Sequence, residues 1–124
     1  MYKGIIESES LINKRILKEI KLVRCYKEEH LDEDPSIWTI NKIEVDNTFF
    51  NSFIKNLSKS IIGGWYSLLW DERFIYVIFR NKIFKIKNAN PWINKEFIPM
   101  VKYALSLGIN KKYFDNLRNS IEKW

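Results

Sequence analysis

The sequence has one cysteine and one histidine, Cys25 and His30, and few glycines or prolines. A single cysteine excludes a disulfide within the chain, and one Cys with one His cannot supply the ligands of a structural zinc site. We therefore predict no metal site and no cofactor. We also expect Cys25 to be a small buried hydrophobic residue, which fits a reducing, cytoplasmic environment.

Long apolar runs are also missing. No segment approaches the ~20 apolar residues of a membrane-spanning helix, and the apolar pair Ile5-Ile6 before Glu7 is too short for a signal peptide. The chain is nevertheless 46% hydrophobic and 15% aromatic, which is enough for a core. We therefore predict a single folded domain over residues 1–124, cytoplasmic and without membrane contact.

Acidic residues are scarce toward the C-terminal end. Residues 73–124 contain eleven Lys or Arg against three Asp or Glu, whereas residues 1–72 contain ten against twelve. The net charge of +6 therefore comes from the last two fifths of the chain. Residues 28–36, by contrast, form an acidic loop that ends with a proline. We expect His30 to be a surface residue within this loop.

Hydrophobic spacing predicts the order of the elements. Apolar residues at three- and four-residue steps predict three helices. The first covers 8–23, and the second begins after a cap at Asp46 and ends at Gly63-Gly64. The third ends at Gly108, and Pro99 within it makes that helix start late or kink. Alternation predicts strands at about 38–45, 65–70, 74–80 and 82–87, with a hairpin turn at Asn81. Residues 22–29 fit either helix or strand, Asn90-Pro91 begins a turn, and 110–124 contain a further short helix.

These elements define an α+β fold. We predict a mainly antiparallel sheet of about four strands with helices packed on one face, related to the ferredoxin-like two-layer sandwich.

The hairpin over 74–87 separates two faces. Its purely apolar side, formed by Ile75, Val77, Phe79, Phe84 and Ile86, should meet the helices. Its reverse side mixes aromatic residues with lysines and is the candidate binding face, together with neighbouring basic and aromatic residues: Trp70, Phe74, Tyr76, Arg80, Lys82, Lys85 and Lys87. Trp70 joins this face if the turn at 71–73 has three residues, and turns inward if it has two.

The strand over 74–79 resembles the central strand of the RNA-recognition motif. Phe74, Tyr76 and Phe79 fall on aromatic positions of that signature. Glu72 and Arg73 stand where the signature has its basic and glycine positions. The resemblance implies base stacking on the aromatic rings and phosphate contacts by the lysines.

No spacing in the sequence identifies a catalytic centre, and we predict no enzyme activity. The candidate acids and bases are His30, Glu44, Asp46, Asp71 and Glu72, and the carboxylates among them are accounted for as cap or turn residues in most cases. A pocket lined by His30 and a carboxylate is the structural feature that an enzyme would require.

Several short segments together resemble a group of small prokaryotic proteins of unknown function. They are Lys3-Gly4-Ile5-Ile6 with Glu7-Ser8-Glu9-Ser10-Leu11, Trp38-Thr39, Trp65-Tyr66, Tyr76-Val77-Ile78-Phe79-Arg80-Asn81-Lys82-Ile83-Phe84 and Tyr103-Ala104-Leu105-Ser106-Leu107-Gly108-Ile109. The group tends to have Pro after the Gly-Ile pair, where this chain has Asn110, and to end soon afterwards. The resemblance implies a shared fold over residues 3–109 and no activity or functional residue.

The sequence thus favours a non-catalytic interaction module, which self-associates as a homodimer or binds a protein partner. The alternative hypothesis is binding of RNA or single-stranded DNA through the aromatic and basic hairpin 73–87.

Overall fold

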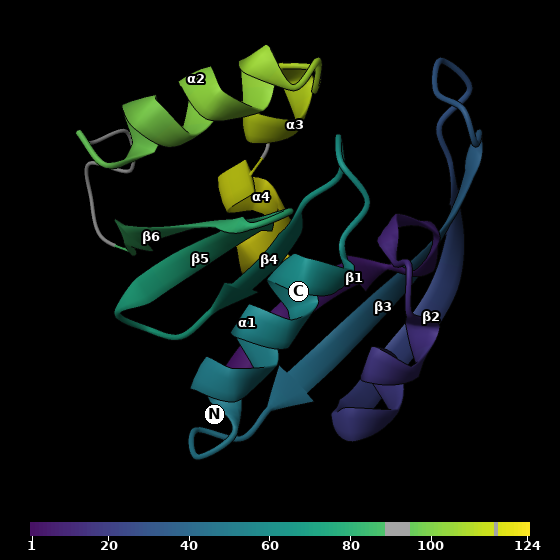
Figure 1. Cartoon of the computed structure of the whole chain (residues 1–124). Coiled ribbons are helices and arrows are strands. Elements are labelled where there is room, and N and C mark those ends of the chain that lie inside the picture. The colour runs from purple at the N-terminus through teal and green to yellow at the C-terminus, as the bar shows by residue number, and fades with distance from the viewer. Residues whose placement is uncertain (89–94, 116) are drawn as a thin grey trace.

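A computed structural model describes residues 1–88, 95–115 and 117–124 of the chain (Figure 1). The strands are β1 (Tyr2–Glu7), β2 (Lys21–Glu29), β3 (Ile37–Val45), β4 (Ser67–Trp70), β5 (Phe74–Phe79) and β6 (Lys82–Lys87). The helices are α1 (Phe50–Ser60), α2 (Phe97–Ser106), α3 (Lys112–Asp115) and α4 (Leu117–Glu122), and two 3-10 segments cover Ser8–Ser10 and Lys14–Glu19.

The six strands form one sheet in the order β2-β3-β1-β4-β5-β6, and all neighbours are antiparallel. The α+β class and the antiparallel sheet are confirmed, but the predicted number of about four strands is too low. The two extra strands are β1 and β2. Alternation in β2 is weak because this edge strand is exposed along almost its whole length, so no buried face imposes a period.

The predicted helix over 8–23 is wrong. Its apolar residues Leu11 and Ile16 are buried as expected. They lie, however, in and beside two short 3-10 segments that precede β2, and Leu11 forms an isolated bridge with Ile61. Apolar side chains at helical spacing thus reach the core from a chain that is not a continuous helix.

Helical side chains belong to two separate apolar clusters on opposite sides of the sheet. Phe53 and Leu57 of α1 pack with Ile78 of β5. Met100 of α2 and Leu117 of α4 pack with alternate β5 residues such as Val77. In place of helices on one face of a ferredoxin-like sandwich, the sheet has α1 on one side and α2, α3 and α4 on the other (Figure 1). The reason is that both sides of β4 and β5 carry large apolar side chains that must be buried.

The β4–β5–β6 meander follows the predicted strands closely. Asn81 has the left-handed φ of 57° that its tight turn requires. The purely apolar side of the β5–β6 hairpin faces α2–α4, as predicted. Pro99 lies in the first turn of α2, so the helix starts late rather than kinking, and Gly108 follows it with a φ of 82°. The turn predicted at Asn90-Pro91 lies outside the described residues.

Gly4 sits in the middle of the sheet, where β1 lies between β3 and β4. A Cβ atom at this position would come within 2.9 Å of both the Leu68 carbonyl oxygen and Leu69 Cγ, and within 3.1 Å of Ile43 Cγ1. Only glycine leaves room for this approach.

Two predictions about single residues are wrong. Cys25 is exposed, because β2 is an edge strand. Asp46 does not cap α1: its Oδ1 accepts hydrogen bonds from the Thr48 amide and hydroxyl in the turn that leads to the helix. Among the described residues, no helix has the length and apolar character needed to cross a membrane.

Candidate functional site

The candidate site lies on the α3–α4 side of the sheet, where β1 ends and the loop between β2 and β3 folds back. This loop is closed by a hydrogen bond of 2.6 Å from the His30 amide to the Ser36 carbonyl. Trp38, at the start of β3, donates from Nε1 to the Pro35 carbonyl at 2.9 Å. The acidic loop is therefore closed at its base, although Leu31 and most of its neighbours stay exposed.

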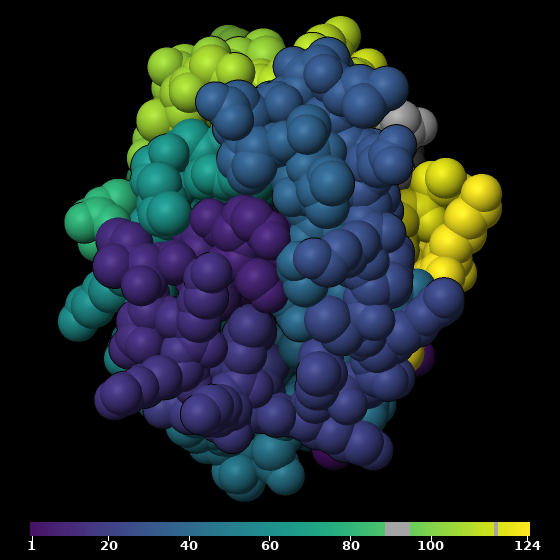
Figure 2. Space-filling view, turned by 90° about the vertical axis from the view of Figure 1, so that its right-hand side faces the viewer, coloured from purple at the N-terminus to yellow at the C-terminus, as the bar shows by residue number. Residues whose placement is uncertain are grey.

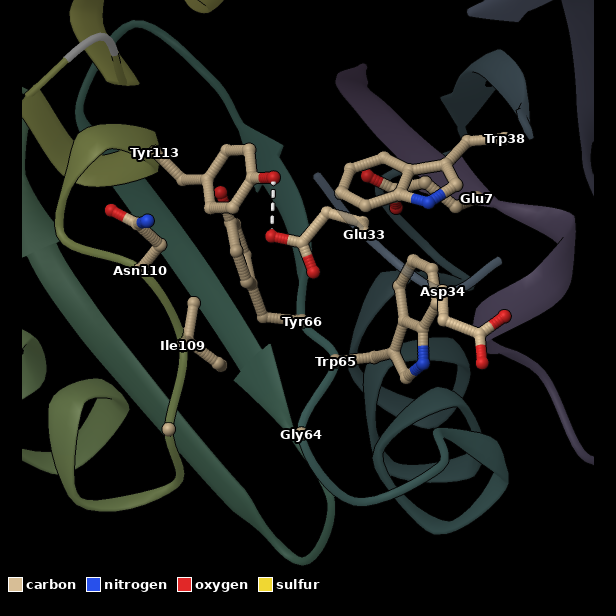
Figure 3. Close-up of a pocket in the computed structure, with 11 residues that line it drawn as sticks. Glu7, Glu33, Asp34, Trp38, Gly64, Trp65, Tyr66, Ile109, Asn110 and Tyr113 are labelled. Carbon is tan, nitrogen blue, oxygen red and sulfur yellow. Dashed lines mark hydrogen bonds between the residues drawn. The ribbon is translucent and has the colours of Figure 1, made fainter. Parts of the chain in front are cut away.

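A partly open cavity of about 160 Å³ lies between this loop, the residues before β4 and the segment between α2 and α3 (Figure 3). Its lining combines carboxylates with aromatic rings and includes no Lys, Arg or His among the described residues. We call it the acidic–aromatic cavity and define it by Glu7, Glu33, Asp34, Trp38, Trp65, Tyr66 and Tyr113.

Glu7, the last residue of β1, has an unusual environment. Its Oε2 is buried and has no hydrogen-bond partner in the described part of the chain. Burial raises the pKa of Glu7 to about 8, a backbone hydrogen bond opposes this, and the negative charges of Glu28 and Glu9 raise the pKa further. The side chain is therefore mostly a neutral carboxylic acid at pH 7.

Glu33 is held in the cavity by a residue from the other end of the chain. Tyr113 of α3 donates from its hydroxyl to Glu33 Oε1 at 2.9 Å (Figure 3). Burial and this hydrogen bond to a carboxylate raise the pKa of Tyr113 above its usual range. Beside it, Lys112 forms an ion pair with Asp32. The acidic loop is thus fastened to α3 at two adjacent points.

A second, larger cavity of about 540 Å³ adjoins the first and shares Glu7, Trp38, Tyr66 and Tyr113 with it. Its lining adds both acidic and basic groups: Glu28, His30, Lys42, Lys112 and Lys123. His30 Nε2 lies 2.6 Å from Glu28 Oε1, and the His30 ring stacks on Trp38 with 3.6 Å between centroids.

His30 is thus less exposed than predicted, with 15% of its side chain accessible. The larger cavity is lined by His30 and the Glu28 carboxylate, the combination that we named from the sequence as necessary for an enzyme. In the described residues, no three His, Cys, Asp or Glu side chains are grouped so as to hold a metal ion.

The structure brings together four residues of the predicted binding face. Tyr76 is opposite Lys85, and Phe74 is opposite Lys87. Lys85 Nζ lies 4.0 Å from the centre of the Phe74 ring. The face is partly covered, because Phe50 of α1 meets Tyr76 edge-on at 4.8 Å.

The other three residues lie elsewhere. Trp70 is 6% exposed and packs on the opposite face, because the turn contains two residues, Glu72 and Arg73, between the paired Asp71 and Phe74. Lys82 extends over Phe84 on that same opposite side. Arg80 donates to the Ile61 carbonyl at 3.2 Å, beside the hairpin tip.

Sequence reasoning missed the acidic–aromatic cavity because its residues are far apart in the chain. The sequence showed the acidic loop, but nothing in it indicated that α3 would close over Glu33. One signal was present in β1. Lys3, Ile5 and Glu7 lie on the same face of this strand, and Ile5 packs against the apolar cluster below α2–α4, so the carboxyl group of Glu7 is placed on a partly buried face.

Comparisons with protein-family models, with curated proteins and with solved structures found no significant match to this chain. The resemblance to small prokaryotic proteins of unknown function therefore stays a prediction.

Proposed function

We propose that this protein is a non-catalytic binding module whose acidic–aromatic cavity takes a positively charged group of a protein partner. The observation that carries the proposal is the lining itself. Three carboxyl groups and four aromatic rings surround a space of about 160 Å³ that no described Lys, Arg or His enters, although the chain as a whole has a net charge of +6.

Aromatic rings and carboxylates attract the same ligands. The face of an aromatic ring is electron-rich and binds ammonium and guanidinium groups, more strongly where water is excluded. A carboxylate such as Glu33 adds a direct charge, and the hydrogen bond from Tyr113 keeps its oxygen in place. A positively charged ligand is therefore the kind that this lining favours, because its carboxylates can balance the ligand's charge.

The size of the cavity favours one side chain rather than a whole cofactor. Sites for drug-sized ligands measure roughly 300–1,000 Å³, which is larger than the 160 Å³ found here. Apolar side chains beside the loop also favour a protein surface as the source: Leu31 is 86% exposed and Ile37 is 49% exposed. We therefore favour a Lys, methylated Lys or Arg side chain presented by a partner chain.

Titration with capped amino acids tests this proposal. Calorimetry should detect binding of N-acetyl-trimethyllysine amide or N-acetyl-arginine amide, and no binding of the uncharged N-acetyl-norleucine amide. Glu33→Gln should weaken binding at least tenfold. Glu29→Gln removes the same charge from β2, outside both cavities, and should leave binding unchanged. No binding of either cation, or equal binding of norleucine, would overturn the proposal.

Self-association is a second part of the interaction-module proposal, and the exposed β2 edge supports it. β2 begins with basic residues and ends with Glu28 and Glu29. Two copies paired antiparallel along this edge would place the basic start of each strand beside the acidic end of the other. Figure 2 shows the molecule from this side, with β2 and the acidic loop in blue.

The second candidate function is binding of single-stranded nucleic acid on the face formed by Phe74, Tyr76, Lys85 and Lys87. The specific observation is the stacked arrangement of Lys85 and the Phe74 ring on an accessible part of the sheet. With Arg73 at its margin, three phosphates are within the reach of basic side chains, so the log–log dependence of affinity on salt should have a slope of about −2.

Titration of a labelled oligonucleotide at two salt concentrations measures that slope. Lys85→Glu should abolish binding, whereas Lys82→Glu, the same charge change on the opposite side of β6, should reduce it much less. Absence of binding at low salt, or equal loss in both variants, would remove this candidate.

A further inference from the structure

Glu7 lies where the two cavities meet. It is the last residue of β1 and pairs with Ile40 of β3, and its side chain lines both cavities. Its Oε2 is buried without a hydrogen-bond partner in the described chain, although the cavity around it is wide enough for a ligand. A buried polar atom without a partner costs free energy, which a ligand with the right chemistry can recover.

Ionisable groups from every neighbouring element line the two cavities or act on the charge of Glu7. They are Glu9 after β1, Tyr26, Glu28 and His30 in and after β2, Glu33 and Asp34 in the acidic loop, Lys42 of β3, Tyr66 before β4, Lys112 and Tyr113 of α3, and Lys123 after α4. The charges that act most on Glu7 are the negative ones of Glu28 and Glu9.

Of the basic members of this set, His30 lies against Glu28, two lysines are engaged with other groups, and the third lysine is exposed. Lys112 is paired with Asp32, and Lys42 Nζ donates to the Trp124 main-chain oxygen at 3.0 Å. Lys123 is exposed beyond α4. The smaller cavity therefore has no described cation of its own to stabilise a Glu7 carboxylate.

We propose that Glu7 is the residue that meets the ligand's positive charge, and that it releases its proton when the cation enters. The inference rests on the proposed cation-binding function and adds which residue provides the charge. One proton leaves for each cation bound, so the net charge of the cavity stays the same. While the cavity is empty, the protonated acid also avoids the unfavourable free energy of a buried, unpaired carboxylate.

Binding should therefore depend on pH in a defined direction. Burial raises the pKa of Glu7 to about 8 in the free protein, and a bound cation lowers it. Below that pH the ligand displaces a proton, so affinity rises with pH by up to about tenfold per unit. Above it the carboxylate is already ionised, and affinity levels off.

Calorimetry in two buffers of different ionisation enthalpy counts the protons released. N-acetyl-trimethyllysine amide is the ligand to use, because its quaternary charge does not titrate. At pH 6.5 the wild-type protein should release close to one proton per ligand. Glu7→Gln, which imitates the protonated acid in shape, should release none and bind at least tenfold more weakly at pH 8.

Two further variants separate Glu7 from its neighbours. Glu33→Gln should weaken binding but still release a proton, and His30→Gln should also still release one. Binding by the wild-type protein without proton release would overturn this inference and leave the proposed function standing. Proton release that persists in Glu7→Gln would overturn it as well. No binding of the cation at any pH would overturn both.

Discussion

At the scale of single residues, the cavity depends on carboxyl groups that the fold treats in opposite ways. Glu33 receives a hydrogen bond from Tyr113, whereas Glu7 Oε2 receives none from the described residues. Glu9, only two residues from Glu7, accepts from the Thr39 amide at 2.6 Å and hydroxyl at 2.8 Å, and these bonds help to lower its pKa although its partial burial acts the other way. At Glu7 burial outweighs hydrogen bonding and raises the pKa, whereas at Glu9 the hydrogen bonds outweigh burial and lower it.

The proton on Glu7 predicts how folding stability depends on pH. Unfolding restores the ordinary pKa of 4.5, whereas the folded protein holds the proton up to a pKa of about 8. As pH rises from about 5 to 8, the unfolded state loses the proton first, so the free energy of unfolding falls, by up to a few kcal/mol.

Urea unfolding of the wild-type protein and Glu7→Gln at pH 5.5 and pH 8.5 checks this. The difference between the two pH values should be smaller in the variant, because glutamine cannot ionise. Glu72→Gln, exposed in the turn between β4 and β5 and away from the β2 edge, should behave like the wild-type protein. An equal pH dependence in Glu7→Gln would contradict the assigned proton.

At the scale of elements, a short helix and a loop hold each other in place. α3 has only four residues and α4 six, so neither would be a stable helix alone. Their apolar residues Phe114 and Leu117 are buried in the same cluster as side chains of the sheet. Lys112 and Tyr113 of α3 make polar contacts to the acidic loop. These two contacts join the loop to α3.

Removal of one hydroxyl group should show this dependence. Tyr113→Phe deletes the bond to Glu33 and leaves a half-buried carboxylate without that donor, so the free energy of unfolding should fall by about 1–2 kcal/mol. Tyr103→Phe is the matched control, since no hydrogen bond of its hydroxyl is found within the described residues. Urea denaturation measures both, and an unchanged stability of Tyr113→Phe would show that the bond does not hold the loop.

The elements also show what the sequence could predict. The facing of the side chains in β5 and β6 and the turn at Asn81 followed from their pattern, whereas the register, which pairs Phe79 with Lys82, could not be chosen from the sequence. β2 could not be assigned, since it is exposed on both faces. The cavity was not predictable, because Tyr113 and Glu33 are 80 residues apart and meet only through the packing of α3.

At the scale of the whole molecule, the sheet has two free edges of different character. β6 begins and ends with lysines. β2 is longer, with nine residues, and exposes Leu22 and Val23, 51% and 45% accessible, next to the charged residues described above. An exposed strand edge with apolar side chains favours pairing with another strand.

We expect light scattering to give twice the chain mass of 15.0 kDa at micromolar concentration. Cys25 is the middle residue of β2, so mild oxidation should cross-link the two copies through it. Val23→Lys should return the protein to a monomer, whereas Ile98→Lys, at an equally exposed apolar residue of α2, should not. A monomeric wild-type protein would contradict pairing along this edge.

The tight space at Gly4 has a consequence for any survey of variants. The residue touches neither cavity, yet it joins the half of the sheet that supplies Glu7 and Trp38 to the half that begins just after Tyr66. A methyl group at position 4 would push these halves apart by contact with the Leu68 carbonyl. Weaker ligand binding in such a variant would therefore result from a wider spacing between β1 and β4, although a binding measurement alone would suggest that Gly4 contacts the ligand.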